Sequence, residues 1–160
     1  AHLASVTGIL RRAGAEVTEL TNGATVRIDG SPRAPGRIET APYPGFPTDL
    51  QSPLTALAAL SRGTTYIIEN LFENRFRHIP QLRKMGADIT VCGRAATVRG
   101  RRLNGSDVEA EDLRGGAALV LAALGAEGTS TVSGLSHIDR GYYDLGGKLS
   151  SLGADIRRLP

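Results

Sequence analysis

The spacing of apolar residues alternates between helical and strand periods along the chain, and this alternation predicts an α/β (α+β) fold. Apolar positions at helical spacing predict helices over 3–13, 50–62 and 78–85, one that begins at 113 and one that ends at 152. The expected apolar face of the helix over 50–62 is Leu50, Leu54, Leu57 and Ala58. The expected stripe on the helix from 113 is Leu113, Ala117, Val120, Leu121 and Leu124.

Short runs rich in apolar and β-branched residues between these helices predict strands. The expected strands span 16–20, 24–28, 37–40, 64–69, 87–92, 95–99, 129–133 and 154–159, with 87–92 and 95–99 forming a hairpin. Segments 70–76 and 134–143 are predicted to be loops. The start of the helix over 50–62 has two interpretations. Thr48 with Gln51 fits a capping box, whereas Ser52 before Pro53 indicates a later start.

Internal repeats organise this pattern. The sequence LRRAGAEV at 10–17 recurs as LRKMGADI at 82–89 and as LSSLGADI at 149–156. Each copy has the form of a last helical turn, a glycine just after the helix, and a strand. ATVR at 24–27 recurs at 96–99, and DLQ at 49–51 matches DLR at 112–114. Several matches in one order predict a fold assembled from repeated units.

The repeats divide the chain into four parts. Residues 1–30 form the second half of a unit, 31–47 a connector rich in proline and glycine, 48–102 a complete unit, and 103–160 most of a further unit. About two and a half of three units are thus expected, in one incomplete domain. Since a half unit leaves strand edges unpaired and the sequence starts with alanine, we expect a piece of a longer chain.

Composition excludes several classes of protein. With 41% hydrophobic and 22% charged residues, the chain can bury a core and does not resemble a disordered tail. No apolar run approaches the ~18 residues of a membrane span, so no membrane partner is expected. The single cysteine excludes a disulfide scaffold and fits a reducing, cytoplasmic compartment. His2, His78 and His137 lack the spacing of metal ligands, and we expect neither a metal nor a cofactor.

Charge favours an anionic ligand. Between 73 and 102 lie eight basic and two acidic residues, a local charge of +6. Such a band attracts phosphates, nucleotides or nucleic acid, although a solvated arginine-rich face is the simpler interpretation. With 4% aromatic residues the chain has few platforms for stacking bases. A phosphorylated small molecule is therefore a better expectation than nucleic acid.

Four motifs give the sequence a family resemblance. They are PGFPTDLQ at 44–51, FENRF at 72–76, DLR at 112–114 and HIDRGY at 137–142, and in this order they resemble the enolpyruvyl transferase family. The resemblance implies two similar domains, each built from three βαβαββ units in an inside-out α/β barrel-type arrangement with buried helices and outer sheets. This chain would supply most of one domain, and the other domain would be its partner.

The resemblance also implies a reaction. The motifs are closest to the family member that moves the enolpyruvyl group of phosphoenolpyruvate to the 3′-hydroxyl of UDP-N-acetylglucosamine, with release of phosphate, in peptidoglycan precursor synthesis. Addition and elimination through a tetrahedral intermediate need a base, an acid and cations around an anionic substrate. The chain alone is expected to be inactive. The relative that acts on shikimate 3-phosphate, and a non-catalytic repeat module that binds nucleotide or RNA, remain alternatives.

The resemblance assigns roles to six residues. Asp49 would contact the sugar hydroxyl as the base, and Arg114 and Arg140 would face phosphoenolpyruvate. Leu71 and Phe72 would contact the uridine nucleotide, with a pair that anchors the loop an equal alternative. Asp112 would orient Arg114 or the substrate end of its helix, with plain helix capping an equal alternative. From the residues alone, a helix-start aspartate and two surface arginines are the simpler interpretations.

Three further features near these motifs are not expected to carry catalytic chemistry or have two possible interpretations. Residues 73–75 are expected to brace their loop internally. Gly115 and Gly116 admit either close approach of a ligand to the helix or tight packing. Cys92, in a predicted strand, is expected to be a structural thiol, because the family's reactive cysteine belongs to the other domain.

Overall fold

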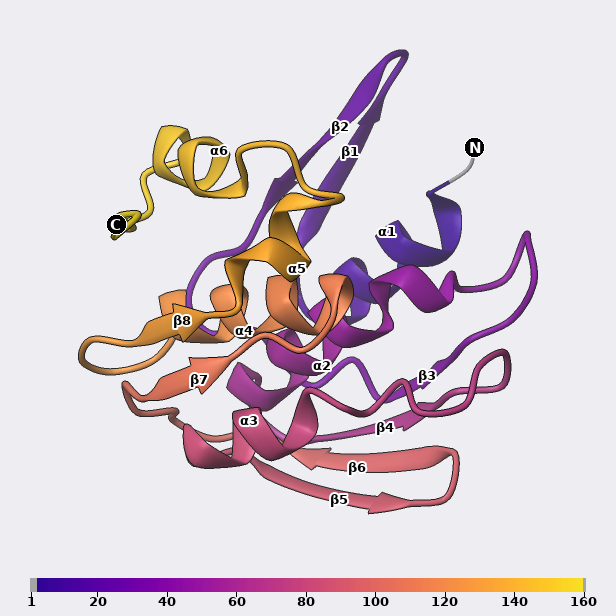
Figure 1. Ribbon diagram of the computed structural model, residues 1–160. Helices are drawn as coiled ribbons and strands as arrows, with labels where there is room; N and C mark the ends of the chain where they lie inside the picture. The colour runs from indigo at the N-terminus through magenta and orange to yellow at the C-terminus, as the bar shows by residue number, and fades with distance from the viewer. Residues whose placement is uncertain (1–2, 160) are drawn as a thin grey trace.

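Two buried helices form the centre of the fold in the computed structural model, which describes residues 3–159. Helix α2 (Gln51–Leu60) packs along α4 (Leu113–Leu124), and the sheets lie around the outside (Figure 1). Alanines make this close contact possible, because Ala56, Ala58 and Ala118 are completely buried. The predicted arrangement of buried helices and outer sheets is confirmed.

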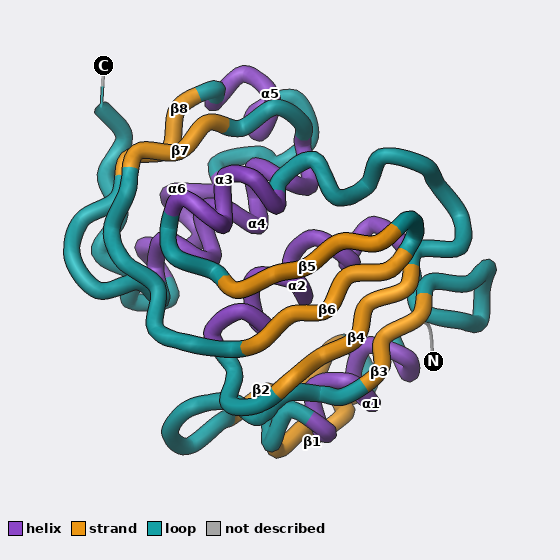
Figure 2. Tube along the Cα trace, turned by 90° about the horizontal axis from the view of Figure 1, so that it is seen from below, coloured by secondary structure: helices purple, strands orange, loops and turns teal. Residues whose placement is uncertain are grey.

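A four-stranded sheet covers one side of the helix pair. Its strands are β3 (Arg37–Glu39), β4 (Thr64–Ile68), β6 (Ala95–Arg99) and β5 (Asp88–Cys92), in the order β3-β4-β6-β5. Figure 2 shows the sheet in front of α2. Ile67 of β4 is completely buried while Tyr66 is 55% exposed, so one face is covered and the other meets solvent. The predicted hairpin of β5 and β6 is confirmed.

The described residues also form two smaller sheets. Strands β1 (Glu16–Leu20) and β2 (Gly23–Arg27) pair antiparallel in a hairpin that projects away from the rest of the chain (Figure 1). Strands β7 (Asp107–Glu109) and β8 (Thr131–Ser133) pair in parallel. This pair flanks α4 in sequence as β3 and β4 flank α2, which repeats the unit in structure. The division at 30, 47 and 102 stays a prediction.

Five shorter helical segments complete the described chain: α1 (Ala4–Arg12), the 3₁₀ turn η1 (Thr48–Leu50), α3 (Ile79–Lys84), α5 (Leu135–Asp139) and α6 (Leu145–Ser151). From residue 3 to residue 159, no helix has both the length and the apolar character that crossing a bilayer requires.

The repeated helix ends share one geometry. Gly14, Gly86 and Gly153 have φ angles of 95°, 91° and 94°, which an L side chain rarely adopts. Each donates its N–H to a carbonyl three residues back, and the next residue donates to a carbonyl five residues back. This is the hydrogen-bond pattern of a Schellman cap. The repeat found in the sequence is therefore present in the backbone.

Two predicted elements near the C-terminal side are wrong. Residues 154–159 form no strand, because no strand among residues 3–159 lies alongside them to complete a ladder. Segment 134–143 is not simply a loop, since α5 occupies its first half. Gly134, in the left-handed region at φ 73°, begins that helix immediately after β8.

Two details of the central helices also differ. Leu121 and Leu124 are each 38% exposed, and the buried side runs instead through Ala118, Leu119 and Ala122. The predicted stripe is therefore correct for the buried Ala117 and Val120 and wrong for Leu121 and Leu124. Neither predicted cap begins α2, whose first residue follows η1 without a side-chain hydrogen bond. Thr48 is occupied elsewhere, as its hydroxyl donates to Glu69.

Candidate functional site

A pocket of about 410 Å³ lies where η1, the 70–76 loop and the start of α4 meet. Four of the six predicted site residues line it, namely Asp49, Leu71, Phe72 and Arg114. The remaining lining residues are Ala41, Pro42, Tyr43, Pro47, Thr48 and Arg75. Segments far apart in the sequence thus bring a carboxylate, two guanidinium groups and an apolar wall together.

One carboxylate oxygen of Asp49 meets both arginines of the pocket. Oδ1 accepts a hydrogen bond of 2.5 Å from Nε of Arg114 and lies 3.9 Å from Nη2 of Arg75. The other oxygen, Oδ2, has no hydrogen bond within residues 3–159. Asp49 is therefore held in place through one oxygen while the second remains available to a ligand hydroxyl.

The ion pair shifts the pKa of both partners. The hydrogen bond from Arg114 is the main cause that lowers the pKa of Asp49, and the positive charges of Arg114 and Arg75 add to it while partial burial opposes it. The same hydrogen bond raises the pKa of Arg114. Both groups are therefore charged at neutral pH, and Asp49 is present in the form that a base requires.

Asp112 caps the helix that carries Arg114. Its Oδ1 accepts hydrogen bonds from the backbone N–H of Arg114 at 2.9 Å and of Gly115 at 2.8 Å. The capping interpretation is confirmed, and a role of Asp112 in orienting the Arg114 side chain stays a prediction. A Cβ on Gly116 would lie 2.6 Å from Cγ1 of Ile138, so tight packing explains this glycine.

Arg140 does not line the pocket. It follows α5 directly, it is exposed, and it has no ion pair within the described part of the chain. The next residue, Gly141, packs against Leu113, the first residue of α4. The segment after α5 therefore reaches the start of α4 at Gly141, which directly follows Arg140.

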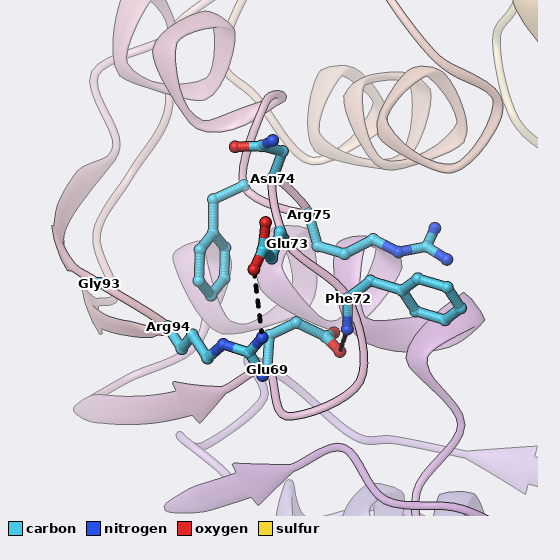
Figure 3. Close-up of a pocket in the computed structure, with 8 residues that line it drawn as sticks. Glu69, Phe72, Glu73, Asn74, Arg75, Gly93 and Arg94 are labelled. Atoms are coloured by element: carbon cyan, nitrogen blue, oxygen red, sulfur yellow. Dashed lines mark hydrogen bonds and ion pairs between the residues drawn. The ribbon is translucent and has the colours of Figure 1, made fainter.

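Arg75 is a site residue that the sequence interpretation assigned to loop bracing. Its guanidinium carbon lies 4.5 Å from the ring centroid of Phe72, so it does support the loop, and it also reaches Asp49. Figure 3 shows its side chain extended over the Phe72 ring. Asn74, at φ 58°, makes the turn that precedes it. The spacing within FENRF alone gives no sign of which side chain faces the pocket.

A second pocket, of about 290 Å³, lies on the other side of the same loop. Glu73 and Arg94 face one another there, with an N–O distance of 3.7 Å between Nη2 and Oε1 (Figure 3). Arg94 also donates to the carbonyl of Asn70 at 2.9 Å. Arg94 thus links the loop to the β5–β6 turn, so the contact of Glu73 is with a neighbouring turn and not internal to the loop as predicted.

Glu69 is a buried acid that the sequence analysis did not single out. It directly follows β4, and its side chain is 1% exposed. An acid is almost never fully buried unless it has partners, and Glu69 accepts four hydrogen bonds. Its signal in the sequence is weak: a single acid that ends the apolar run TTYII.

His78 lies behind the pocket, between the loop and α4. It is 3% exposed, and neither ring nitrogen has a hydrogen-bond partner in the part of the chain that is described. Burial lowers its pKa from 6.5 to about 4, while the Asp112 carboxylate and the backbone of Arg75 act in the opposite direction. His78 is therefore neutral at pH 7 and serves as packing against the start of α4.

This burial predicts a pH dependence of stability. Because the pKa of His78 falls from 6.5 in the unfolded chain to about 4 in the folded one, the unfolded chain binds the proton first as pH drops. The free energy of unfolding should lose about 3 kcal/mol from this group between the two pKa values. Urea titrations at pH 7, 5.5 and 4 give the free energy of unfolding of the wild type and of His78→Leu. It should fall less with decreasing pH in His78→Leu than in the wild type, and an equal fall in both proteins would contradict the prediction.

The remaining candidates add no chemistry to the site. Cys92 ends β5 and is exposed, outside the pocket. Between residues 3 and 159, no three His, Cys, Asp or Glu side chains gather in a way that would hold a metal ion. Within the basic band, several arginines have local partners: Arg83 bonds the carbonyl of Ile89, Arg99 pairs with Asp88, and Arg102 pairs with Glu127.

Comparisons with known sequences identify relatives of this chain. The family model for EPSP synthase (3-phosphoshikimate 1-carboxyvinyltransferase) matches residues 1–149. UDP-N-acetylglucosamine 1-carboxyvinyltransferase 3 of Symbiobacterium thermophilum is 51% identical over 158 residues, 98% of this chain and 37% of that protein. UDP-N-acetylglucosamine 1-carboxyvinyltransferase of Desulfofundulus thermocisternus is 51% identical over 160 residues, 99% of this chain and 65% of that protein. The chain thus spans between about a third and two thirds of the length of these relatives.

Solved structures agree as well. The enolpyruvyl transferase NikO from Streptomyces tendae superposes with a TM-score of 0.85 at 34% identity, over 97% of this chain and 36% of that one. EPSP synthase from Acinetobacter baumannii, at 19% identity, shares the fold with a TM-score of 0.64 over 80% of this chain and 31% of that one. The resemblance in the sequence motifs is confirmed, and the chain belongs to the enolpyruvyl transferase family that the EPSP synthase model describes.

Proposed function

We propose that the protein to which this chain belongs transfers the enolpyruvyl group of phosphoenolpyruvate to the 3′-hydroxyl of UDP-N-acetylglucosamine and releases phosphate. The observation that carries the proposal is Asp49, held by Arg114 and Arg75 through one oxygen in a pocket walled by Leu71 and Phe72. The names of the two relatives at 51% identity support this acceptor. The reaction makes a peptidoglycan precursor, and we place it in the cytoplasm.

Asp49 would act on the acceptor in the first step. Its free Oδ2 takes the proton of the 3′-hydroxyl as the sugar oxygen attacks C2 of phosphoenolpyruvate. A proton is added to C3 at the same time, from an acid outside this chain. The product of this addition is a tetrahedral phospho-lactyl adduct, and elimination of phosphate with loss of a C3 proton restores the double bond.

The arginines would bind the anionic donor. A guanidinium group stays charged and can bind a carboxylate or phosphate through two parallel hydrogen bonds. Arg114 lines the pocket, and the exposed Arg140 lies in the neighbouring segment without a partner among residues 3–159. We assign both to phosphoenolpyruvate, and we assign the backbone and apolar surface of Leu71 and Phe72 to the uridine nucleotide.

Turnover requires a second domain. The donor carries a phosphate and a carboxylate, and the reaction needs an acid that none of the proposed site residues supplies. We propose that the four segments of this chain form most of one domain and that the partner domain closes over the pocket. The chain alone, which spans 37% of the relative from Symbiobacterium thermophilum, should therefore release no phosphate from the two substrates.

An acceptor exchange tests this function. The complete protein that carries this chain is incubated with phosphoenolpyruvate and either UDP-N-acetylglucosamine or shikimate 3-phosphate, and the product is identified by mass spectrometry. Phosphate release and an enolpyruvyl nucleotide sugar are expected only with the first acceptor. The match to the EPSP synthase model makes shikimate 3-phosphate the specific alternative. Turnover of shikimate 3-phosphate alone would replace the proposed acceptor.

A further inference from the structure

Glu69 joins the two walls of the pocket. On one side, Thr48 of η1 donates its hydroxyl to Oε2 at 2.8 Å. On the other, the backbone N–H groups of Leu71 and Phe72 donate to Oε1 at 2.9 and 3.1 Å. Figure 3 shows the bond to Phe72 at the base of the loop. Thr48 directly precedes Asp49, so one carboxylate links the candidate base to the loop that faces it.

A third contact ties the carboxylate to the neighbouring strand. Thr40, which follows β3, donates its hydroxyl to Oε1 of Glu69 at 2.9 Å and accepts the backbone N–H of Asn70 at 2.9 Å. Thr40 is completely buried and Glu69 nearly so, at 1% exposed. The bonds from Thr40 and Thr48 are therefore buried, and both oxygens of the acid are used.

We propose that Glu69 is a positioning residue that fixes the distance between Asp49 and the Leu71–Phe72 backbone, and thereby the width of the site for the nucleotide sugar. The identity of the ligand rests on the proposed function, whereas the geometry rests on the hydrogen bonds alone. Glu69 does not line the pocket of Asp49, so it acts through Thr48 and the loop.

The bond pattern distinguishes two substitutions. Glutamine can keep its oxygen on the side where Thr40, Leu71 and Phe72 donate, while its amide donates to the hydroxyl of Thr48, which can turn to accept. Leucine has a similar volume but accepts no hydrogen bond. Glu69→Gln should therefore keep the distance between Asp49 and the Leu71–Phe72 backbone. In Glu69→Leu this distance should no longer be fixed.

Amide exchange tests the geometry without a ligand. In the complete protein, Glu69→Leu should speed hydrogen exchange of the Leu71 and Phe72 amides by about 100-fold, while α2 and β4 amides stay within about threefold. Glu69→Gln should stay close to the wild type. The control is Glu16→Gln, an exposed acid of β1 outside this network, which should leave these amides unchanged.

Kinetics then test the consequence for the ligand. Glu69→Leu should raise the KM for UDP-N-acetylglucosamine by about tenfold or more while the KM for phosphoenolpyruvate stays within about twofold, because only the acceptor site is widened. Glu69→Gln should restore most of the affinity. A variant that merely unfolds would lower the active fraction and leave both KM values unchanged.

Several results would overturn the inference. In Glu69→Leu, the Leu71 and Phe72 amides could exchange at the wild-type rate, or the β4 amides could lose as much protection from exchange as they do. The glutamine and leucine variants could also be impaired equally. If Glu69→Leu does not fold, Thr48→Val removes the one bond to η1 and should raise the KM for the nucleotide sugar about threefold. No change in that KM would also overturn it. The exchange result stands even where the proposed reaction fails, so the two failures are distinguishable.

Discussion

Replacement of Asp49 by alanine in the complete protein should lower kcat by about 10²- to 10⁴-fold, the usual contribution of a positioned general base. Asp49 offers its free Oδ2 to the acceptor hydroxyl, while Oδ1 is held by Arg114 at 2.5 Å. Alanine removes the proton acceptor and leaves both arginines without their common partner. The measurement is steady-state phosphate release at saturating concentrations of both substrates.

The matched control is Asp88→Ala. Asp88 is also an aspartate paired with an arginine, with 3.4 Å between its Oδ1 and Nη1 of Arg99, but it is only partly exposed and lies on the outer sheet. Its replacement should leave kcat within about twofold, as surface ion pairs contribute little. A near-normal kcat in Asp49→Ala would exclude the base role.

Replacement of Arg114 by alanine should lower kcat/KM for phosphoenolpyruvate by about 10- to 100-fold, the typical effect of losing a hydrogen bond to a charged group. It should also change the pH profile. Because the hydrogen bond from Arg114 is the main cause of the lowered pKa of Asp49, its removal should raise that pKa. Asp49 would then become protonated at higher pH, and the acidic limb of kcat would move to higher pH.

Arg114→Lys separates charge from shape. Lysine keeps the positive charge but lacks the planar group that donates from Nε. Compared with Arg114→Ala, the acidic limb of Arg114→Lys should lie closer to its wild-type pH. The affinity for phosphoenolpyruvate should be restored only slightly. The pH profile of kcat and the KM for each substrate give the comparison. An acidic limb that stays in place in Arg114→Ala would contradict the ion pair as the cause of the lowered pKa.

Much of the fold could be predicted from the sequence because the units repeat. A last helical turn, a glycine and a strand recur, and the backbone reproduces the same cap at Gly14, Gly86 and Gly153. The central helices were expected to be buried, and they are. The strand at 154–159 was wrong because a local apolar pattern does not supply the neighbouring strand that a ladder needs.

The site was only partly accessible from the sequence. Asp49 and Arg114 are 65 residues apart, and only the family resemblance placed both in one pocket. Capping by Asp112 could be expected from its position before an apolar run. The roles of Arg75 and Glu69 could not, because they depend on which way side chains point in a loop that tertiary contacts hold. Local periodicity has no information about such directions.

A crystal structure of the complete protein with UDP-N-acetylglucosamine would test the central claim most directly, namely that this pocket binds the nucleotide sugar with Asp49 at its reacting hydroxyl. We predict that Oδ2 of Asp49 lies within hydrogen-bond distance, about 2.6–3.2 Å, of the 3′-hydroxyl, with the uridine against Leu71 and Phe72. A nucleotide sugar bound elsewhere, or one whose 3′-hydroxyl faces away from Asp49, would contradict it.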